Sequence, residues 1–362
     1  MELTSTTNAA PDRATWAAEH FDDWYDVLAA AEAQDRPDPS TWRRGELRAE
    51  LERGSTEEEV HLVLAREGGV PVGVAEVRFT LLDNTRTAWV QVGVVADQRR
   101  RGVGTALLEH ALDLAEAAGR STVRISVDRP VTHPEETWPG SRAARAWGFT
   151  RGQLEARRQL PLPVPPERLV ALAAAARPHA SGYRLRSFAG WVPEADLDVM
   201  AALTARMSTD APMGDLEVEP EVWDGDRIRE VEAARAAQGR HQWVAVAEDP
   251  GGAAVGYSVL VRSDHEPERL IQLDTLVLRE HRGHRLGMLL KLECLRTAVV
   301  DNPVAQRVST WNAVSNTPMI AVNEQLGFVL DELIEELEAP VAEIRHTLRD
   351  HTLRDQTLRN RT

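Results

Sequence analysis

Hydrophobic residues show helical and strand-like spacing in both halves of the chain, in a similar order. In the first half, helical spacing and then apolar strand-like runs predict two helices and two strands, at residues 15–31, 39–51, 60–65 and 70–81. In the second half, the pattern predicts a strand at residues 183–188 and helices at residues 194–207 and 220–237. It then predicts a hairpin whose strands are residues 241–247 and 253–261. Each half therefore favours an α+β fold around a mixed central sheet.

Two stretches of the chain resemble each other in detail. The stretch around residues 87–119 contains a strand, an arginine-rich loop with glycine and an amphipathic helix, and the stretch around residues 270–300 repeats that order. Each is followed by another strand and by a helix that ends in Gly-Phe. Aligning Arg99 with Arg282 also aligns Gly104 with Gly287, an offset of 183 residues, about half of the chain. Self-similarity at a fixed offset predicts a tandem duplication.

The duplication divides the chain into four expected segments. An N-terminal domain is expected over residues 1–160 and a C-terminal domain over residues 182–340. Residues 161–181 contain several prolines, which stiffen a linker. Residues 341–362 repeat a polar five-residue unit, and we expect a disordered tail or a loosely held helix without chemistry.

Composition limits the partners and the compartment. The 362 residues fit two domains, and 42 Lys and Arg against 57 Asp and Glu give a net charge of −15, so no nucleic-acid partner is expected. A single cysteine, Cys294, excludes an intramolecular disulfide and a cysteine-based zinc site, and no metal is expected. The sequence has no apolar run long enough for a membrane span, and its N-terminus does not resemble a secretory signal peptide. We therefore expect a cytoplasmic protein without a membrane partner.

An arginine-flanked glycine loop joins a strand to a helix in each half. The first loop is Arg99-Arg100-Arg101-Gly102-Val103-Gly104, and the second is Arg282-Gly283-His284-Arg285-Leu286-Gly287. Glycine lets the backbone turn tightly, so that successive N–H groups face one point. The helix that follows directs the positive end of its dipole at the same point. Each loop is therefore a candidate site for a diphosphate group.

These loops resemble the acyl-CoA-binding motif of the GNAT acetyltransferase superfamily, (Gln/Arg)-x-x-Gly-x-(Gly/Ala). The first loop matches it fully, and the second has Arg285 in place of the inner glycine. The segment from Asn316 to Gly327-Phe328 resembles the later Asn-x-x-Ala…Gly-Phe element of that family. Because the order of elements agrees as well, the chain is identified as a tandem-domain GNAT protein with two acyl-CoA N-acyltransferase-like domains.

The resemblance implies direct transfer of an acetyl group from acetyl-CoA, the expected co-substrate, to the primary amine of a small molecule. It also implies that pantetheine lies beside the strand before each loop. The implied cofactor contacts are the residues of both loops together with Gly93, Val94, Leu276, Val277 and Asn316. A backbone N–H of the strand would polarise the thioester carbonyl, and a carboxylate near the strand end would help to remove the proton of the amine.

The two halves differ at the position of that carboxylate. In the family the acid lies eight residues before the first arginine of the loop, which is Asp274 in the second half and Gln91 in the first. Gln91 cannot act as a base, so Asp274 is the expected catalytic residue and the C-terminal domain the expected catalytic one. The alternative for Asp274 is a strand-end carboxylate that caps a neighbouring amide. Asn323 and Ala144 replace the tyrosine that often protonates the thiolate, and Tyr257 is a spare candidate for that role.

Two other functions stay open. The missing tyrosines and the altered second loop favour a non-catalytic acyl-CoA-binding sensor or scaffold. A mycothiol-synthase-like acetyltransferase is the alternative enzyme, because tandem halves of this kind occur there. The acidic composition is a weak indication of a cationic acceptor such as a polyamine, but no motif identifies the acceptor or the oligomeric state.

Overall fold

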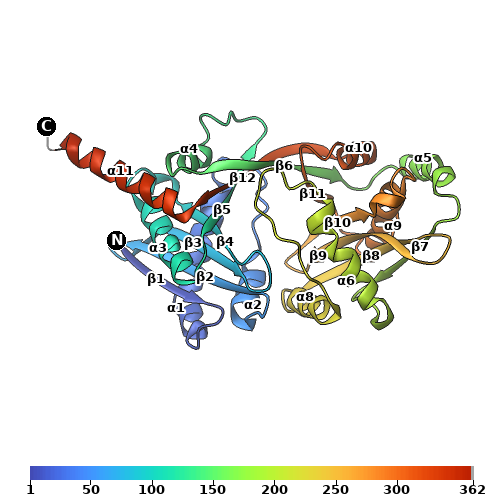
Figure 1. Cartoon of the computed structure of the whole chain (residues 1–362), viewed down its shortest axis with the longest axis horizontal. Helices are drawn as coiled ribbons and strands as arrows, with labels where there is room; N and C mark the ends of the chain where they lie inside the picture. The colour runs from blue at the N-terminus through green and yellow to red at the C-terminus, as the bar shows by residue number, and fades with distance from the viewer. Residues whose placement is uncertain (360–362) are drawn as a thin grey trace. The chain divides into compact units, whose positions relative to one another are not determined.

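A computed structural model describes residues 1–359. The chain forms two units: the first contains Met1–Leu154 and the segment from Ile334 onward, and the second contains Glu155–Leu333. Each unit has a mixed sheet with helices on both faces (Figure 1). The α+β fold expected for both halves is confirmed.

The N-terminal unit begins with a strand that the sequence pattern did not predict. Its elements up to residue 146 are β1 (Glu2–Thr7), α1 (Arg13–Ala33), α2 (Arg44–Arg53), β2 (Glu58–Glu67), β3 (Val70–Thr80), β4 (Thr87–Val94), η1 (Ala96–Gln98), α3 (Val103–Ala117), β5 (Thr122–Pro130) and α4 (Pro139–Ala146). Strands β1 to β5 lie side by side in chain order, antiparallel except for the parallel pair β4 and β5.

Alternate side chains of β2 contact helices on opposite faces of the sheet in the N-terminal unit. Val60, Leu62 and Leu64 pack with α1 and α2, whereas Val63 and Ala65 pack with α3. Successive side chains of a strand point to opposite faces, so a strand that is apolar at every position is buried on both. β4 therefore lies between α1 and α3, and its end delivers the glycine loop to the first turn of α3.

The C-terminal unit repeats this architecture. Its elements are α5 (Pro166–Ala176), η2 (Arg177–Ala180), β7 (Arg184–Ala189), η3 (Glu194–Asp196), α6 (Leu197–Ala205), α7 (Met207–Asp210), α8 (Gly225–Ala237), β8 (Arg240–Glu248), β9 (Ala254–Ser263), β10 (Glu266–Val277), η4 (Arg279–His281), α9 (Leu286–Asp301), β11 (Arg307–Ala313) and α10 (Thr317–Leu326). On β8, Trp243, Ala245 and Ala247 face α9, and Val244 and Val246 face α6 and α8.

The last strand of each half divides between the units. The first residues of β6 (Thr150–Pro161) belong to the N-terminal unit, and its remainder pairs with β11 in the C-terminal unit. From Ile334, β12 (Val329–Pro340) belongs to the N-terminal unit, where it lies beside β5. The units are therefore interleaved in sequence and do not follow the divisions expected at residues 160 and 340.

The segment expected as a tail forms α11 (Val341–Arg359), and residues 360–362 lie outside the described part. Its first turns pack on α3, because Ile344 and Leu348 join the same hydrophobic cluster as Leu108. Arg345 also donates a hydrogen bond of 3.0 Å to Glu116 of α3. The beginning of α11 is thus part of the N-terminal core.

The segment expected as a Pro-rich linker, residues 161–181, contains α5. Leu169, Leu172 and Ala176 pack with the cluster that surrounds α9. Pro166 stands at the first helical position, where the missing N–H of proline costs no hydrogen bond. Proline therefore starts a helix here and does not mark a spacer.

Candidate functional site

In each unit two parallel strands pair at one end and separate at the other. β4 pairs with β5 over Thr87–Trp89, and β10 pairs with β11 over Arg269–Gln272. Both strands continue beyond that ladder, to Val94 and to Val277. A strand edge that lacks a neighbour can pair with an extended ligand through its backbone N–H and C=O groups.

β10 contains an irregularity at the separation that β4 lacks. The register of β10 against β9 shifts between Gln272 and Thr275, so that Leu273 and Asp274 together oppose one position of β9. A bulge re-aims side chains, and here two consecutive ones line the same cavity. The pairing of β4 with β3 has no such shift, and Gln91 keeps the ordinary alternation.

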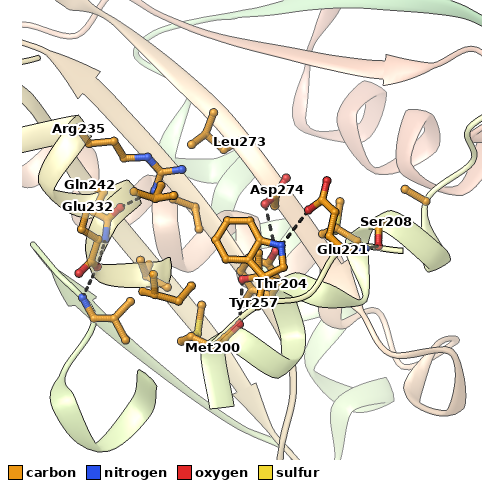
Figure 2. A pocket seen from close by; sticks show the side chains of 18 of the residues that line it. Met200, Thr204, Ser208, Glu221, Glu232, Arg235, Gln242, Tyr257, Leu273 and Asp274 are labelled. Atoms are coloured by element: carbon orange, nitrogen blue, oxygen red, sulfur yellow. Dashed lines mark hydrogen bonds between the residues drawn. The ribbon is translucent and has the colours of Figure 1, made fainter. Parts of the chain in front are cut away.

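Asp274 faces a cavity of about 390 Å³ formed by α6, α7, α8 and strands β8 to β10. Figure 2 shows its carboxylate beside Tyr257, whose hydroxyl donates a hydrogen bond of 3.0 Å to Oδ2. Burial raises the pKa of Asp274, although this hydrogen bond and the charge of Arg235 act in the opposite direction. A carboxylate with a raised pKa is a better proton acceptor near neutral pH. Burial also raises the pKa of Tyr257 far above its usual value, so this hydroxyl orients Asp274 as a neutral donor.

Several polar side chains of the cavity carry no sequence motif. Arg235 and Glu232 come from α8, Gln242 from β8, and Glu221 from the irregular segment between α7 and α8. Glu221 accepts a hydrogen bond of 2.8 Å from the indole of Trp223. Helical periodicity marks α8 as a helix, but it does not indicate which of its polar residues face a cavity.

The two glycine loops adopt the same backbone conformation. Positive φ angles occur at the second and fourth positions of both: 66° at Arg100 and 90° at Gly102, then 86° at Gly283 and 55° at Arg285. Each loop therefore holds one glycine and one arginine at these positions. A left-handed conformation costs a residue with a side chain about 1–2 kcal/mol, so both loops carry some strain.

The first arginine of each loop closes it onto the preceding strand. Arg99 donates through Nε to the carbonyl of Val94 at 3.1 Å, and Arg282 donates likewise to the carbonyl of Val277 at 3.1 Å. The carbonyl groups of Val94 and Val277, two of the expected pantetheine contacts, therefore already accept hydrogen bonds from the protein. Their arginines shape the loop in addition to any contact with phosphate.

The remaining arginines of the first loop are available to a ligand. Arg100 and Arg101 are exposed, and they make no hydrogen bond or ion pair with the residues that the structure describes. Gly102 is open, because no atom lies within 4 Å of a Cβ added there. Val103 is buried in the core, and Gly104 contacts Trp147, so these two offer only backbone groups. Two free guanidinium groups at a helix N-terminus fit a diphosphate.

The side chains of the second loop bind the protein itself. Arg282 forms an ion pair of 3.3 Å with Asp210, His284 bonds a carbonyl of η2 at 2.9 Å, and Arg285 donates to a carbonyl of α5 at 3.1 Å. Leu286 is buried, whereas Gly283 and Gly287 have open space around them. A diphosphate in this loop would therefore depend on backbone N–H groups and on the dipole of α9.

The other expected cofactor contacts have structural partners. Gly93 lies where α1 approaches β4, since an added Cβ would be 3.1 Å from the Cβ of Ala31. Asn316 caps α10 and accepts from the N–H of Met319 at 3.4 Å. Asn323, at the place of the family tyrosine, is fully buried and donates to Asn312 at 2.7 Å. None of these side chains is an acid for the leaving thiolate.

A carboxylate of the N-terminal unit reaches the position that corresponds to Asp274. Gln91 and Thr41 both donate hydrogen bonds to Glu32, which lies in the last turn of α1. Burial raises the pKa of Glu32. An acid on a different element than the strand is invisible to motif spacing, which is why the sequence did not indicate it.

Comparison with known proteins places these features in a family. Residues 21–134, from α1 to the segment after β5, match the acetyltransferase (GNAT) family. The whole chain is similar to the structure of a tandem GNAT protein from the clavulanic acid biosynthesis pathway, solved without AcCoA. The two share 28% identity and a TM-score of 0.74, over 94% of this chain and 99% of that chain. Together, the family match and this likeness support a tandem-domain GNAT protein.

Other solved structures share the fold of this chain. A GCN5-related N-acetyltransferase from Sphaerobacter thermophilus has a TM-score of 0.61 at 16% identity, over 94% of this chain and 96% of that chain. A putative acetyltransferase from Pyrococcus horikoshii has a TM-score of 0.53 at 12% identity, over 93% and 89%. No protein of curated function matches the sequence. The GNAT fold is that of acyl-CoA-dependent acetyltransferases.

Within the described residues, His, Cys, Asp and Glu side chains nowhere gather in a group of three that would hold a metal ion. No helix in that part of the chain has the length and apolar character needed to cross a bilayer.

Proposed function

We propose that this protein is an acetyl-CoA-dependent N-acetyltransferase that acetylates a primary amine of a small molecule in its C-terminal unit. One observation carries the proposal: the bulge of β10 turns Asp274 into a cavity of about 390 Å³ at the point where β10 leaves β11. A cavity of this size takes a small molecule. Beyond Gln272 the edge of β10 is not paired with β11, so its backbone groups can pair with an extended thioester arm.

The residues that would hold acetyl-CoA are the backbone of Leu276 and Val277 and the loop from Arg282 to Gly287. The co-substrate supplies an activated acetyl thioester. Asp274 accepts the proton of the attacking amine, directly or through water, and Tyr257 keeps its carboxylate in place. Because a base must be ionised, the raised pKa of Asp274 implies that kcat/KM falls as the pH drops through that pKa.

The test is thiol release from acetyl-CoA with a panel of primary amines. General-base catalysis contributes about 10²–10⁴-fold, so Asp274→Asn is expected to lose activity on that scale. Glu32→Gln is the matched control, because it neutralises the carboxylate at the corresponding place of the N-terminal unit. Full activity of Asp274→Asn together with a loss in Glu32→Gln would assign the reaction to the other unit and contradict the proposal.

A second candidate is a non-catalytic acyl-CoA-binding role for the N-terminal unit. It is favoured by the free side chains of Arg100 and Arg101 and by the family match, which covers residues 21–134. Calorimetric titration with acetyl-CoA gives the number of sites per chain. Two sites with amine-dependent thiol release support binding by both units, whereas binding without release from any amine favours a sensor.

A further inference from the structure

The cavity beside Asp274 carries charges of both signs. Figure 2 shows Asp274 and Glu221 on one side and the guanidinium of Arg235 on the other, with Leu273 between them. Glu232 also lines the cavity, but Arg229 neutralises it at 2.8 Å. The charges left for a ligand are therefore two carboxylates and one guanidinium.

Arg235 makes no direct contact with a carboxylate among the described residues. Its Nη1 donates to the side-chain oxygen of Gln242 at 2.9 Å, and it forms no ion pair with the residues that the structure describes. Burial lowers the pKa of Arg235, which shows that its charge is poorly solvated, and the nearby charge of Asp274 acts against this. A buried cation whose hydrogen bond goes to a neutral amide is stabilised further when an anion binds directly to it.

The surroundings of Arg235 hold it in one orientation. Gln242 is buried and donates to Glu232 at 3.0 Å, while its oxygen receives the bond from Arg235. Glu232 in turn accepts from the backbone N–H of Val192 at 2.7 Å. A guanidinium that is fixed in this way can present its remaining donors to a carboxylate.

We propose that the acceptor is an amino acid, whose amine meets Asp274 and whose carboxylate binds Arg235. This rests on the proposed function and names the substrate class of the same site. A plain polyamine would satisfy the carboxylates of the cavity but would repel Arg235. An amine that also carries a carboxylate complements both sides, and the apolar walls from Met200, Met207 and Trp223 can pack on its carbon chain.

The experiment compares matched acceptors that differ only in the carboxylate: lysine and ornithine against their carboxamides and against cadaverine and putrescine. The wild-type enzyme is expected to favour the free acids. Arg235→Gln is expected to lower kcat/KM for the acids by about 10–100-fold, the value of a hydrogen bond to a charged group, and to change it for the carboxamides by less than about threefold. Arg235→Lys is expected to restore part of the loss. Arg296→Gln, on the exposed face of α9, is the control.

Equal effects of Arg235→Gln on acids and carboxamides would overturn the inference, as would a wild-type preference for the amines without carboxylate. Calorimetric titration with lysine and with its carboxamide measures binding without turnover, so it distinguishes a failure of the carboxylate site from a failure of the proposed function. If no amine releases thiol but lysine binds only while Arg235 is present, the proposed function fails and the carboxylate site stands. If thiol is released only with amines that lack a carboxylate, the proposed function stands and the carboxylate site fails.

Discussion

The single lysine of the chain, Lys291, is buried, and a buried charge destabilises the folded state. Lys291 lies in α9 with 3% of its surface exposed, and it forms no hydrogen bond or ion pair with the described residues. Its ammonium nitrogen lies 5.6 Å from the ring centre of Phe328. Burial lowers the pKa of Lys291 to about 7 from an ordinary value of 10.5. One pKa unit corresponds to 1.36 kcal/mol, so keeping this charge in the folded chain costs about 5 kcal/mol.

This cost depends on pH in a defined direction. Between about pH 7 and pH 10.5 the unfolded chain binds a proton at Lys291 that the folded chain has released. Stability therefore rises with pH across this window, by about 2 kcal/mol between pH 7 and pH 9 from this group alone. Lys291→Met keeps the volume and removes the charge. It is expected to be more stable than the wild type by a few kcal/mol near pH 7, and the gap is expected to narrow toward pH 10.

Urea unfolding of both proteins between pH 6 and pH 10 measures the gap. Lys291→Arg is the matched control, because arginine stays protonated and its deficit relative to the wild type should grow as the pH rises. NMR of protein labelled only at lysine reports one side chain, which should titrate near pH 7. A lysine signal that titrates near its ordinary value would contradict a buried Lys291, as would a constant difference in stability between the wild type and Lys291→Met.

Two further substitutions test the site and its support. Tyr257→Phe removes a hydrogen bond that lowers the pKa of Asp274, so the acidic limb of the pH profile of kcat/KM should move to higher pH; an unmoved limb would mean that Tyr257 does not orient this carboxylate. Gly256→Ala places a Cβ 2.6 Å from the carbonyl of Leu276, and overpacking of this kind should cost about 1–3 kcal/mol in urea unfolding. Gly287→Ala has open space and should change stability little, so equal losses in both variants would contradict the packing argument.

The sequence predicted what local chemistry and repetition determine. The offset of 183 residues that relates the two loops also relates the first residues of α3 and α9, Val103 and Leu286. The structure adds another pair at this offset, Gly73 and Gly256, which both allow a close approach to the strand or helix beside them. Asp274 follows from its distance to the loop. These features depend on short stretches of chain, in which residue type and spacing carry the information.

The features that the sequence did not predict depend on distant segments. The shift of register at Leu273 arises from the pairing of β10 with β9, and neither strand alone marks it. Arg235 and Glu32 reach the strand ends from helices with no motif of their own. The division of β6 and β12 between the units likewise depends on which strands they meet in the fold. Hydrophobic periodicity predicts which face of a helix or strand is buried, but it does not predict which other element packs against that face.

The features expected of an acetyltransferase are spread unevenly over the two units. The C-terminal unit has the bulge, the cavity and Asp274, but Asp210 neutralises an arginine of its loop. The N-terminal unit has two free arginines, but Gln91 takes the place of the acid and is bonded to Glu32. Free arginines strengthen the binding of a diphosphate, but they do not promote acetyl transfer. A buried carboxylate promotes removal of the amine proton, but it adds no affinity for the cofactor. The position of the acid, more than the completeness of the loop, is therefore the reason why we propose the C-terminal unit as the place of the reaction.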